Sequence, residues 1–212
     1  MNAAAMTNLD RCEEREAEAM EVNGEEPGRL ARLCRERGAL LVHVSTDGVL
    51  EPVNVYSRSK VLGERRVVEG GAGDALIVRI STVFGPHERR DDFVRFVVRT
   101  LREGKEVRAI SDMICSPTYT LDAARAILAA AEGGARGVHA FVNEPSISRY
   151  EFARAIAQAW GVDGAIRPVR MDEFTGFKAK RPRDTSMQAT LGAWHKPMSL
   201  VACLADYRTF WP

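Results

Sequence analysis

The sequence predicts an α/β fold: a partial doubly wound (Rossmann-like) parallel sheet, with a small α/β domain towards its C-terminal end. Apolar runs alternate with amphipathic helical segments along most of the 212 residues, a pattern typical of parallel strands joined by helices. The runs ALLVHVS (39–45) and ALIVRIS (75–81) are almost continuously apolar. We therefore expect both to be strands that helices cover on both faces.

The remaining elements follow from periodicity and from residues typical of helix ends. Residues 2–5, NAAA, resemble the end of a strand. Gly38 is in a suitable position to end a helix, and an aspartate begins and a glycine ends the segment 91–104. The predicted helices are 9–23, 24–38, 56–70, 91–104, 121–133, 148–161 and 199–210. Further strands are expected at 106–110 and 137–143, and a loop at 180–187.

Composition excludes several classes of partner. Thirty Lys and Arg residues oppose 29 Asp and Glu residues, for a net charge of +1, which gives no electrostatic reason to expect nucleic acid or a membrane surface. The four cysteines and four histidines show no metal-ligand spacing, so no metal site is expected. Apolar runs are shorter than the ~20 residues of a membrane span, and the start does not resemble a signal peptide. We expect a soluble, cytoplasmic protein.

Three residues in the stretch from His43 to Glu64 suggest catalysis. Tyr56 and Lys60 lie four apart in a predicted helix and so share a face. A free tyrosine has a pKa of about 10, and a nearby ammonium should lower it and make Tyr56 a usable proton donor. Thr46 or Ser45, at the end of the preceding strand, could hydrogen-bond a carbonyl oxygen. These groups suit the reduction of a ketone by hydride from a nicotinamide.

The same spacing has a simpler interpretation. A Tyr–Lys pair four residues apart arises by chance in roughly one such chain in ten, and it is more often surface decoration. The surroundings favour the catalytic interpretation here. The pair follows a buried strand that ends in Ser-Thr-Asp and precedes a second buried strand.

Four motifs in order, VHVSTD, NVYSRSKVLGE, VRISTVFGP and SPTYTLDAARAI, resemble those of the extended short-chain dehydrogenase/reductases. Within that group the chain is most similar to the dTDP-4-dehydrorhamnose reductase family, from Asn2 to about Tyr207. The resemblance implies an oxidoreductase of dTDP-rhamnose biosynthesis, which reduces a nucleotide-linked 4-keto-6-deoxy sugar with NADPH or NADH. A related subfamily, the regulatory beta subunit of methionine adenosyltransferase, leaves open a non-catalytic homologue that binds a partner protein.

The resemblance also implies roles for individual residues. Tyr56 would donate the proton, Lys60 would lower its pKa and bind the nicotinamide ribose, and Thr46 would hold the keto oxygen. The cofactor would be bound by Ala4, Ala5, Lys60, Ile80 and Ser81. The substrate would be bound by Thr46, Thr82, Asp92 and Arg181, although Asp92 also suits a helix cap and Arg181 a solvated basic loop.

The sequence predicts two domains, each of which is formed by two separate segments of the chain. Residues 1–86 and 116–143 are expected to form the partial cofactor-binding core, and residues 87–115 and 144–212 the substrate-binding domain. The family begins with a Gly-rich turn that binds pyrophosphate at a helix N-terminus, and this chain shows no such turn. Its pairs Gly70-Gly71 and Gly133-Gly134 are predicted helix ends. We therefore expect an N-terminally truncated sheet with an open edge, covered in a homodimer or by another partner.

Overall fold

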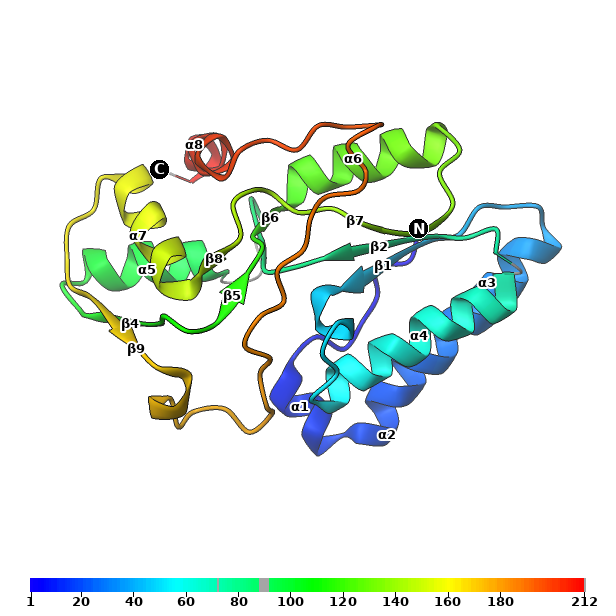
Figure 1. Cartoon of the computed structure of the whole chain (residues 1–212), viewed down its shortest axis with the longest axis horizontal. Coiled ribbons are helices and arrows are strands. Elements are labelled where there is room, and N and C mark those ends of the chain that lie inside the picture. Colours follow the sequence, from blue (N-terminus) through cyan, green and yellow to red (C-terminus); the bar gives the residue numbers. More distant parts are fainter. Residues whose placement is uncertain (72, 88–91, 212) are drawn as a thin grey trace.

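Three parallel strands form the central sheet of the computed structural model, in the order β1–β2–β7 (Figure 1). The structure describes residues 1–71, 73–87 and 92–211. Strand β1 (Val42–Thr46) pairs in register with β2 (Leu76–Ile80), and β2 pairs with β7 (Gly137–Ala140). Asn2 adds a single parallel bridge to His43 on the outer side of β1. The predicted partial parallel sheet is confirmed.

The other elements agree closely with the prediction. The helical segments are α1 (Leu9–Glu14), α2 (Glu16–Ala19), the π-helical turn η1 (Met20–Glu25), α3 (Glu26–Glu36), the 3-10 turn η2 (Asp47–Val49), α4 (Val55–Gly71), α5 (Phe93–Arg102), α6 (Thr120–Glu132), α7 (Arg149–Trp160), the 3-10 turn η3 (Met171–Glu173) and α8 (Leu200–Phe210). The short strand pairs are β3 (Val83–Phe84) with β6 (Thr118–Tyr119), β4 (Val107–Ile110) with β9 (Ile166–Val169), and β5 (Ile114–Cys115) with β8 (Ile147–Ser148).

Two predicted elements differ in detail. The helix expected over 9–23 is divided into α1, α2 and the π-helical turn, and residues 2–5 form one bridge instead of a strand. Residue 91, the expected start of α5, lies outside the described residues. Within those residues, no helix combines the length and apolar character needed to cross a bilayer.

Helices cover the sheet on both faces (Figure 1). One core lies between the sheet and α6; its side chains include Val42, Leu76, Val78, Ala126, Ile127 and Phe141. The other lies between the sheet and the α3–α4 pair; its side chains include Ala31, Leu41, Val67, Ala75 and Ile77. Because strand side chains alternate between faces, this double covering explains why β1 and β2 are apolar at nearly every position.

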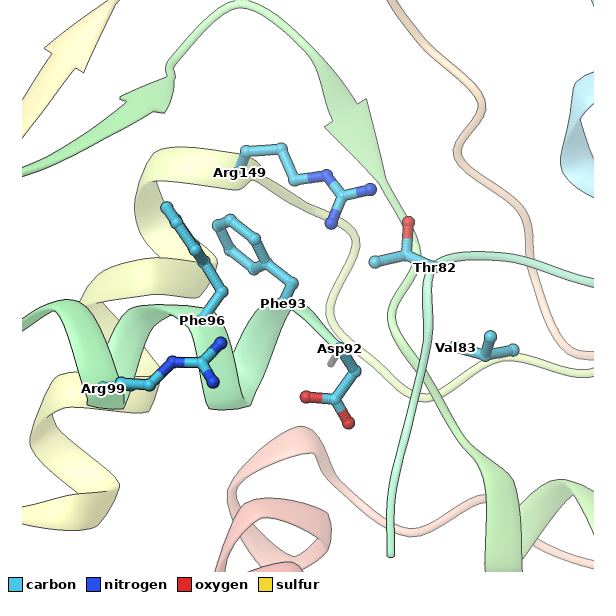
Figure 2. Close-up of a pocket in the computed structure, with 7 residues that line it drawn as sticks. All are labelled: Thr82, Val83, Asp92, Phe93, Phe96, Arg99 and Arg149. Atoms are coloured by element: carbon cyan, nitrogen blue, oxygen red, sulfur yellow. The ribbon is translucent and has the colours of Figure 1, made fainter. Parts of the chain in front are cut away.

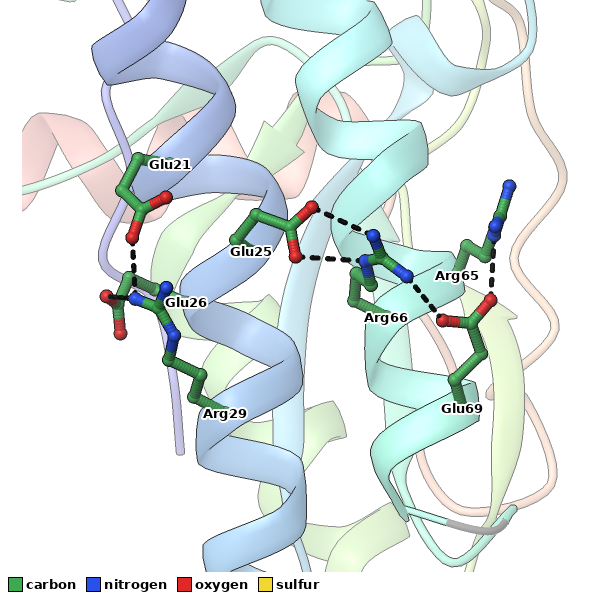
Figure 3. Close-up of polar contacts among 7 residues, drawn as sticks. All are labelled: Glu21, Glu25, Glu26, Arg29, Arg65, Arg66 and Glu69. Carbon is green, nitrogen blue, oxygen red and sulfur yellow. Dashed lines mark hydrogen bonds and ion pairs between the residues drawn. The ribbon is translucent and has the colours of Figure 1, made fainter.

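Helices α3 and α4 approach each other closely because glycines line their contact. A Cβ on Gly70 would lie 2.6 Å from the carbonyl oxygen of Gly28 in α3, and one on Gly63 would lie 2.2 Å from that of Asn23 in the π-helical turn η1, which leads into α3. Figure 3 shows ion pairs on the exposed side, where Arg66 binds both carboxylate oxygens of Glu25 at 3.0 Å. Exposed ion pairs contribute little, so close backbone packing is the main contact between these helices.

A third core, away from the sheet, joins α5, α7 and α8 around buried aromatic rings. The ring centroids of Phe84 and Tyr119 are 5.4 Å apart, and those of Phe84 and Phe152 are 5.5 Å apart. Asp92 is the N-cap of α5 and accepts from the Arg95 amide at 2.9 Å. Its other oxygen accepts from the Tyr207 hydroxyl at 3.0 Å. The capping interpretation of Asp92 is therefore confirmed.

The segment 174–199 runs from η3 past α1 and then over the sheet and α6 to α8 (Figure 1). The Lys180 carbonyl accepts from the Asn54 side chain at 2.8 Å, just before α4. The Thr185 amide donates to the Ile114 carbonyl at 3.1 Å, and the Thr190 amide donates to the Ala140 carbonyl at 2.9 Å. This segment thereby brings C-terminal residues to the carboxyl ends of β1 and β2.

Candidate active site

The candidate catalytic residues meet where β1 ends and α4 begins. Thr46 is the last residue of β1, and Tyr56 lies in the first turn of α4, which starts at Val55. Asn54 fixes this start because its side-chain oxygen accepts from the Ser57 amide at 2.8 Å. The Thr46 hydroxyl faces Tyr56 and favours the ionised form of its phenol. The structure thus brings together the two hydroxyl groups that the sequence proposed.

The environment of Tyr56 reverses the expected pKa shift. Burial raises the pKa of Tyr56 to about 12, and the nearby Asp47 and Cys12 add to the rise. The Thr46 hydroxyl lowers this pKa but does not outweigh burial. The expectation that Lys60 lowers this pKa is therefore wrong for this structure, since removal of the phenol from water dominates. Tyr56 remains fully protonated at neutral pH.

Lys60 is directed at the strand beneath it. Its Nζ donates to the Val44 carbonyl at 2.8 Å and lies 3.4 Å from His43 Nε2. Only 2% of Lys60 is exposed, and this burial lowers its pKa to about 8, although Glu64 partly opposes the shift. Lys60 is thus a buried amine that still carries a charge at neutral pH.

His43 is a core residue whose ring nitrogens have partners. It is fully buried, and its Nδ1 lies 3.2 Å from the Asn2 side-chain nitrogen. Burial and the Lys60 charge lower the pKa of His43 to about 3. The imidazole is therefore neutral and separates Lys60 from Asn2.

Asp47, which the sequence analysis did not single out, joins three segments at this point. Its Oδ1 accepts from the Thr46 hydroxyl at 2.8 Å. Its Oδ2 accepts from the Ser81 hydroxyl at 2.6 Å and from the Thr185 hydroxyl at 2.5 Å. Ser81 follows β2 and Thr185 belongs to the returning segment, so their approach depends on tertiary structure that spacing does not reveal.

Asn23 is a second residue that the sequence analysis missed. It lies in the π-helical turn and is 1% exposed. Its amide group binds both the N–H and the carbonyl of Met6, at 2.8 and 3.0 Å, and donates to the Ser59 hydroxyl at 3.0 Å. Ser59 in turn donates to the Tyr56 carbonyl at 2.7 Å. Asn23 thus connects the chain after Ala4-Ala5 to the first turn of α4.

The other predicted cofactor residues lie around this group. The Ala4 amide donates to the Asn2 side-chain oxygen at 3.1 Å. Ile80 pairs with Thr46 across β1 and β2, and Ser81 is bound to Asp47. Ser45 has a buried hydroxyl without a hydrogen-bond partner. This unpartnered hydroxyl, with Lys60 on the neighbouring helix, fits the polar groups of a nicotinamide ribose.

For the pyrophosphate of such a cofactor, the described residues offer no comparable fit. Gly70 and Gly71 are the last residues of α4, and Gly133 is the C-cap of α6. The prediction that these glycines end helices is confirmed.

A cavity of about 510 Å³ opens beside Thr82 (Figure 2). Its lining residues are Thr82, Val83, Asp92, Phe93, Phe96, Arg99 and Arg149. The rings of Phe93 and Phe96 stack with their centroids 6.1 Å apart. The central carbon of the Arg149 guanidinium lies 5.0 Å from the centroid of the Phe93 ring. Thr82 has a positive φ of 39°, which is strained for a β-branched residue. The wall therefore combines aromatic faces with cationic groups.

Arg181 does not line this cavity. Its guanidinium donates to Asp10 at 3.1 Å and to the Ala179 carbonyl at 2.8 Å, and it lies 4.3 Å over the Phe177 ring. In this structure Arg181 holds the returning segment against α1. Asp92 reaches the rim of the cavity, although its carboxylate also caps α5.

Comparison with known proteins places the chain in a family. The family model described as "RmlD substrate binding domain" matches residues 1–198. The dTDP-4-dehydrorhamnose reductase of Mycobacterium tuberculosis is 37% identical over 230 aligned positions, which cover 99% of this chain and 73% of the relative. The dTDP-4-keto-6-deoxy-D-glucose reductase of Streptomyces niveus is 34% identical over 200 positions, which cover 87% of this chain and 68% of the relative.

Solved structures agree with this placement. The crystal structure of dTDP-4-dehydrorhamnose reductase from Bacillus anthracis, in complex with NADP, superposes with a TM-score of 0.90 at 28% identity. The match covers 98% of this chain and 78% of that one. The order of elements, the residues at the end of β1 and these similarities lead to one conclusion. The chain belongs to the RmlD family of dTDP-4-dehydrorhamnose reductases.

Proposed function

We propose that this chain reduces the 4-keto group of a dTDP-linked 4-keto-6-deoxy sugar with NADPH. The observation that carries the proposal is the placement of Thr46, the last residue of β1, beside Tyr56 in the first turn of α4, with buried Lys60 one helical turn further along that helix. The relatives named above are reductases of such sugars, and the B. anthracis structure contains NADP. These names give no support to the alternative of a regulatory, non-catalytic homologue.

The proposed roles follow from the chemistry of each side chain. A bound nicotinamide supplies the hydride to the carbonyl carbon. Tyr56, protonated at neutral pH, donates its proton to the carbonyl oxygen. Thr46 is proposed to hold the carbonyl oxygen in place, and the Lys60 ammonium offsets the charge of the phenolate that remains. Ala4, Ala5, Ile80 and Ser81 are proposed to contact the cofactor.

We propose that the cavity beside Thr82 receives the nucleotide part of the substrate. A guanidinium such as that of Arg149 matches diphosphate oxygens in fork geometry, and the Phe93 and Phe96 rings offer faces on which a base can stack. Ser81 binds Asp47 at the catalytic end of β1, and its neighbour Thr82 lines the cavity. The candidate catalytic residues and the cavity therefore adjoin each other. Thr46 and Thr82 would then contact the sugar between them.

We propose that one of the two predicted domains binds the cofactor and the other binds the substrate. The three-stranded sheet and the candidate catalytic residues fall in residues 1–86 and 116–143, proposed to bind the cofactor. The aromatic core and most of the cavity fall in 87–115 and 144–212, proposed to bind the substrate. We also propose that a second copy of the chain covers the outer edge of β1, where the described residues supply only the Asn2 bridge. Sedimentation over a range of concentrations tests this, and a strictly monomeric chain would contradict it.

The function is tested by turnover with purified components. The chain is mixed with NADPH and dTDP-4-dehydrorhamnose, and oxidation of the nicotinamide is followed by absorbance, with NADH in a parallel reaction. Turnover that requires the keto sugar supports the proposal. A chain that binds NADPH saturably, as measured by fluorescence, yet shows no turnover with the sugar contradicts it.

A further inference from the structure

Two side chains connect Lys60 to the first residues of the chain. The Lys60 Nζ donates to the Val44 carbonyl at 2.8 Å and lies 3.4 Å from His43 Nε2. The other ring nitrogen of His43, Nδ1, lies 3.2 Å from the side-chain nitrogen of Asn2. His43 is fully buried and Lys60 is 2% exposed. Asn2, His43 and Lys60 therefore form a row of polar groups that leads from the outer side of β1 to the candidate active site.

The position of Asn2 is fixed by hydrogen bonds. Its backbone amide donates to the Val42 carbonyl at 2.7 Å, and its carbonyl accepts from the Val44 amide at 3.0 Å. Its side-chain oxygen accepts from the Ala4 amide at 3.1 Å. This last bond determines which way the side-chain amide points, because the reverse orientation would place the NH2 group against the Ala4 N–H. The NH2 group of Asn2 therefore faces His43.

The orientation of Asn2 determines the tautomer of His43. An NH2 group can only donate, so His43 Nδ1 must accept from it. Burial and the Lys60 charge lower the pKa of His43 to about 3, and a neutral imidazole carries a single proton. That proton is therefore on Nε2, the nitrogen that faces Lys60.

This tautomer of His43 favours one form of Lys60. An ammonium group has three donors and no acceptor, so its contact with Nε2–H would join two donors. A free amine has a lone pair, which can accept from Nε2–H while the amine still donates to the Val44 carbonyl. Every polar group in the row therefore has a suitable partner when Lys60 is the free amine.

We propose that Asn2 and His43 are positioning residues for Lys60: Asn2 fixes the tautomer of His43, and the Nε2–H of His43 stabilises Lys60 as a free amine. The inference rests on the reductase function proposed above, in which the Lys60 ammonium offsets the charge of the phenolate. The row therefore sets the upper limit of the pH range in which Lys60 carries that charge.

The charged and titratable groups on the neighbouring elements do not cancel this effect. Glu64, one turn further along α4, favours the ammonium form of Lys60. Both carboxylate oxygens of Glu64 accept from Arg79 of β2, at 2.9 and 2.7 Å, so this pair is neutral as a whole. Tyr56, one turn before Lys60, keeps its proton and is also neutral. On β1, the titratable group in contact with Lys60 is His43.

The first experiment determines the tautomer of His43 in the wild-type chain. Long-range NMR correlation spectra of protein labelled with 15N-histidine show which ring nitrogen carries the proton. His43→Gln identifies the signals or, if that variant does not fold, replacement of the other three histidines does. We expect the proton on Nε2 at pH 9. A proton on Nδ1 would overturn the proposal.

A second experiment measures the charge of Lys60 in a variant that reverses the contact. NMR titration of protein labelled with [ε-13C]lysine gives the midpoint, and Lys60→Met identifies the signal among the five lysines. Asn2→Asp replaces the donor that faces His43 by an acceptor of the same size. The His43 proton should then move to Nδ1, and Nε2 should accept from the ammonium. The Lys60 midpoint is expected to rise by about one pH unit.

Asn8→Asp is the matched control, because it introduces the same charge at the exposed N-cap of α1. Salt screens an exposed charge, so the Lys60 midpoint should stay at its wild-type value in this variant. A midpoint that is unchanged in Asn2→Asp, or that rises equally in both variants, contradicts the proposal. If Asn2→Asp does not fold, the tautomer of the wild-type chain decides.

A third experiment measures reduction of the keto sugar as a function of pH. The alkaline decline of kcat should begin about one pH unit higher in Asn2→Asp than in the wild type, because Lys60 keeps its charge further into alkaline solution. The same decline in both chains would count against the proposal. If the wild-type chain shows no turnover, the proposed function fails, while the two NMR experiments still decide the role of Asn2 and His43.

Discussion

At the scale of single residues, burial decides the chemistry of this site more than spacing does. Tyr56 and Lys60 are one helical turn apart, yet burial shifts the pKa of both towards the neutral form, to about 12 and about 8. A buried tyrosine that keeps its proton suits the donor of a reduction. With Tyr56 as the proton donor, we expect kcat to be constant through neutral pH and to decline only in alkaline solution.

Replacing Tyr56 by phenylalanine tests its role as proton donor. We expect kcat to fall about 10²- to 10⁴-fold, since positioned acid catalysis contributes that much. NADPH affinity should change little, because the ring remains. Steady-state kinetics and a fluorescence titration of NADPH measure the two quantities. Equal kcat values for Tyr56→Phe and the wild type would show that another group supplies the proton.

Lys60 should reduce stability at neutral pH. Its pKa of about 8 in the folded chain lies below the ordinary value of 10.5, so the unfolded chain binds more protons between these values. Stability therefore rises with pH in this window, and the full cost of burying the charge is present below it. Lys60→Met should raise the free energy of unfolding by about 1–3 kcal/mol at pH 7.

Urea unfolding at neutral pH and near pH 10 measures this effect. The advantage of Lys60→Met should shrink at the higher pH, where wild-type Lys60 is neutral. Lys105→Met, on an exposed side chain, should change stability by no more than about 0.5 kcal/mol at either pH. A Lys60→Met chain less stable than the wild type at pH 7 would contradict the account.

At the scale of elements, the site depends on how closely α4 packs against the π-helical turn η1. The π-helical turn places Asn23 against Met6 and Ser59, and its carbonyl leaves no room for a side chain at Gly63. The contact therefore fixes α4, and with it Tyr56 and Lys60, relative to β1. Helix packing here determines the position of the catalytic face.

Gly63→Ala should disturb this contact. The new Cβ would meet the Asn23 carbonyl at 2.2 Å, so α4 and the π-helical turn must separate, at a cost of about 1–3 kcal/mol. Gly192→Ala is the matched control, since a Cβ there has no atom within 4 Å. Chemical denaturation of both variants measures the difference. If both lose the same stability, the contact of α4 with the π-helical turn is less tight than described.

The sequence could predict the elements because apolar periodicity reflects local burial. The runs 39–45 and 75–81 became β1 and β2, and Asp92 became the cap of α5. Asp47 and Asn23 escaped prediction because their partners are distant in the chain: Asp47 and Thr185 are 138 residues apart. The rise in the pKa of Tyr56 could not be predicted either. It results from burial, and burial depends on tertiary packing that the spacing of residues does not encode.

At the scale of the whole molecule, the segment 174–199 ties the two halves together. It binds α1 through Arg181 and Asp10, the start of α4 through Asn54, and the catalytic end of β1 through Thr185 and Asp47. Hydrogen bonds from the Ala179 amide and Arg181 lower the pKa of Asp10. We therefore expect the candidate catalytic residues to be held in fixed positions only when this segment is docked.

Arg181→Met should loosen the segment. The loss of its hydrogen bonds to Asp10 and Ala179 should increase local opening about tenfold, which corresponds to about 1.4 kcal/mol. Limited proteolysis with chymotrypsin, which can cut at Phe174 and Phe177, measures this opening. Arg183→Met is the control, because Arg183 is exposed and lies 3.7 Å from Asp112. Equal cleavage rates in the two variants would contradict the claim that Arg181 holds the segment 174–199 in place.

The central claim is that hydride from the cofactor reaches a keto sugar at this site. The most direct test supplies NADPH that carries deuterium at the transferable position, together with dTDP-4-dehydrorhamnose, and weighs the sugar product by mass spectrometry. The account predicts one deuterium on the product of the wild-type chain and very little product from Tyr56→Phe. A chain that binds both NADPH and the keto sugar but leaves the sugar unreduced would contradict it.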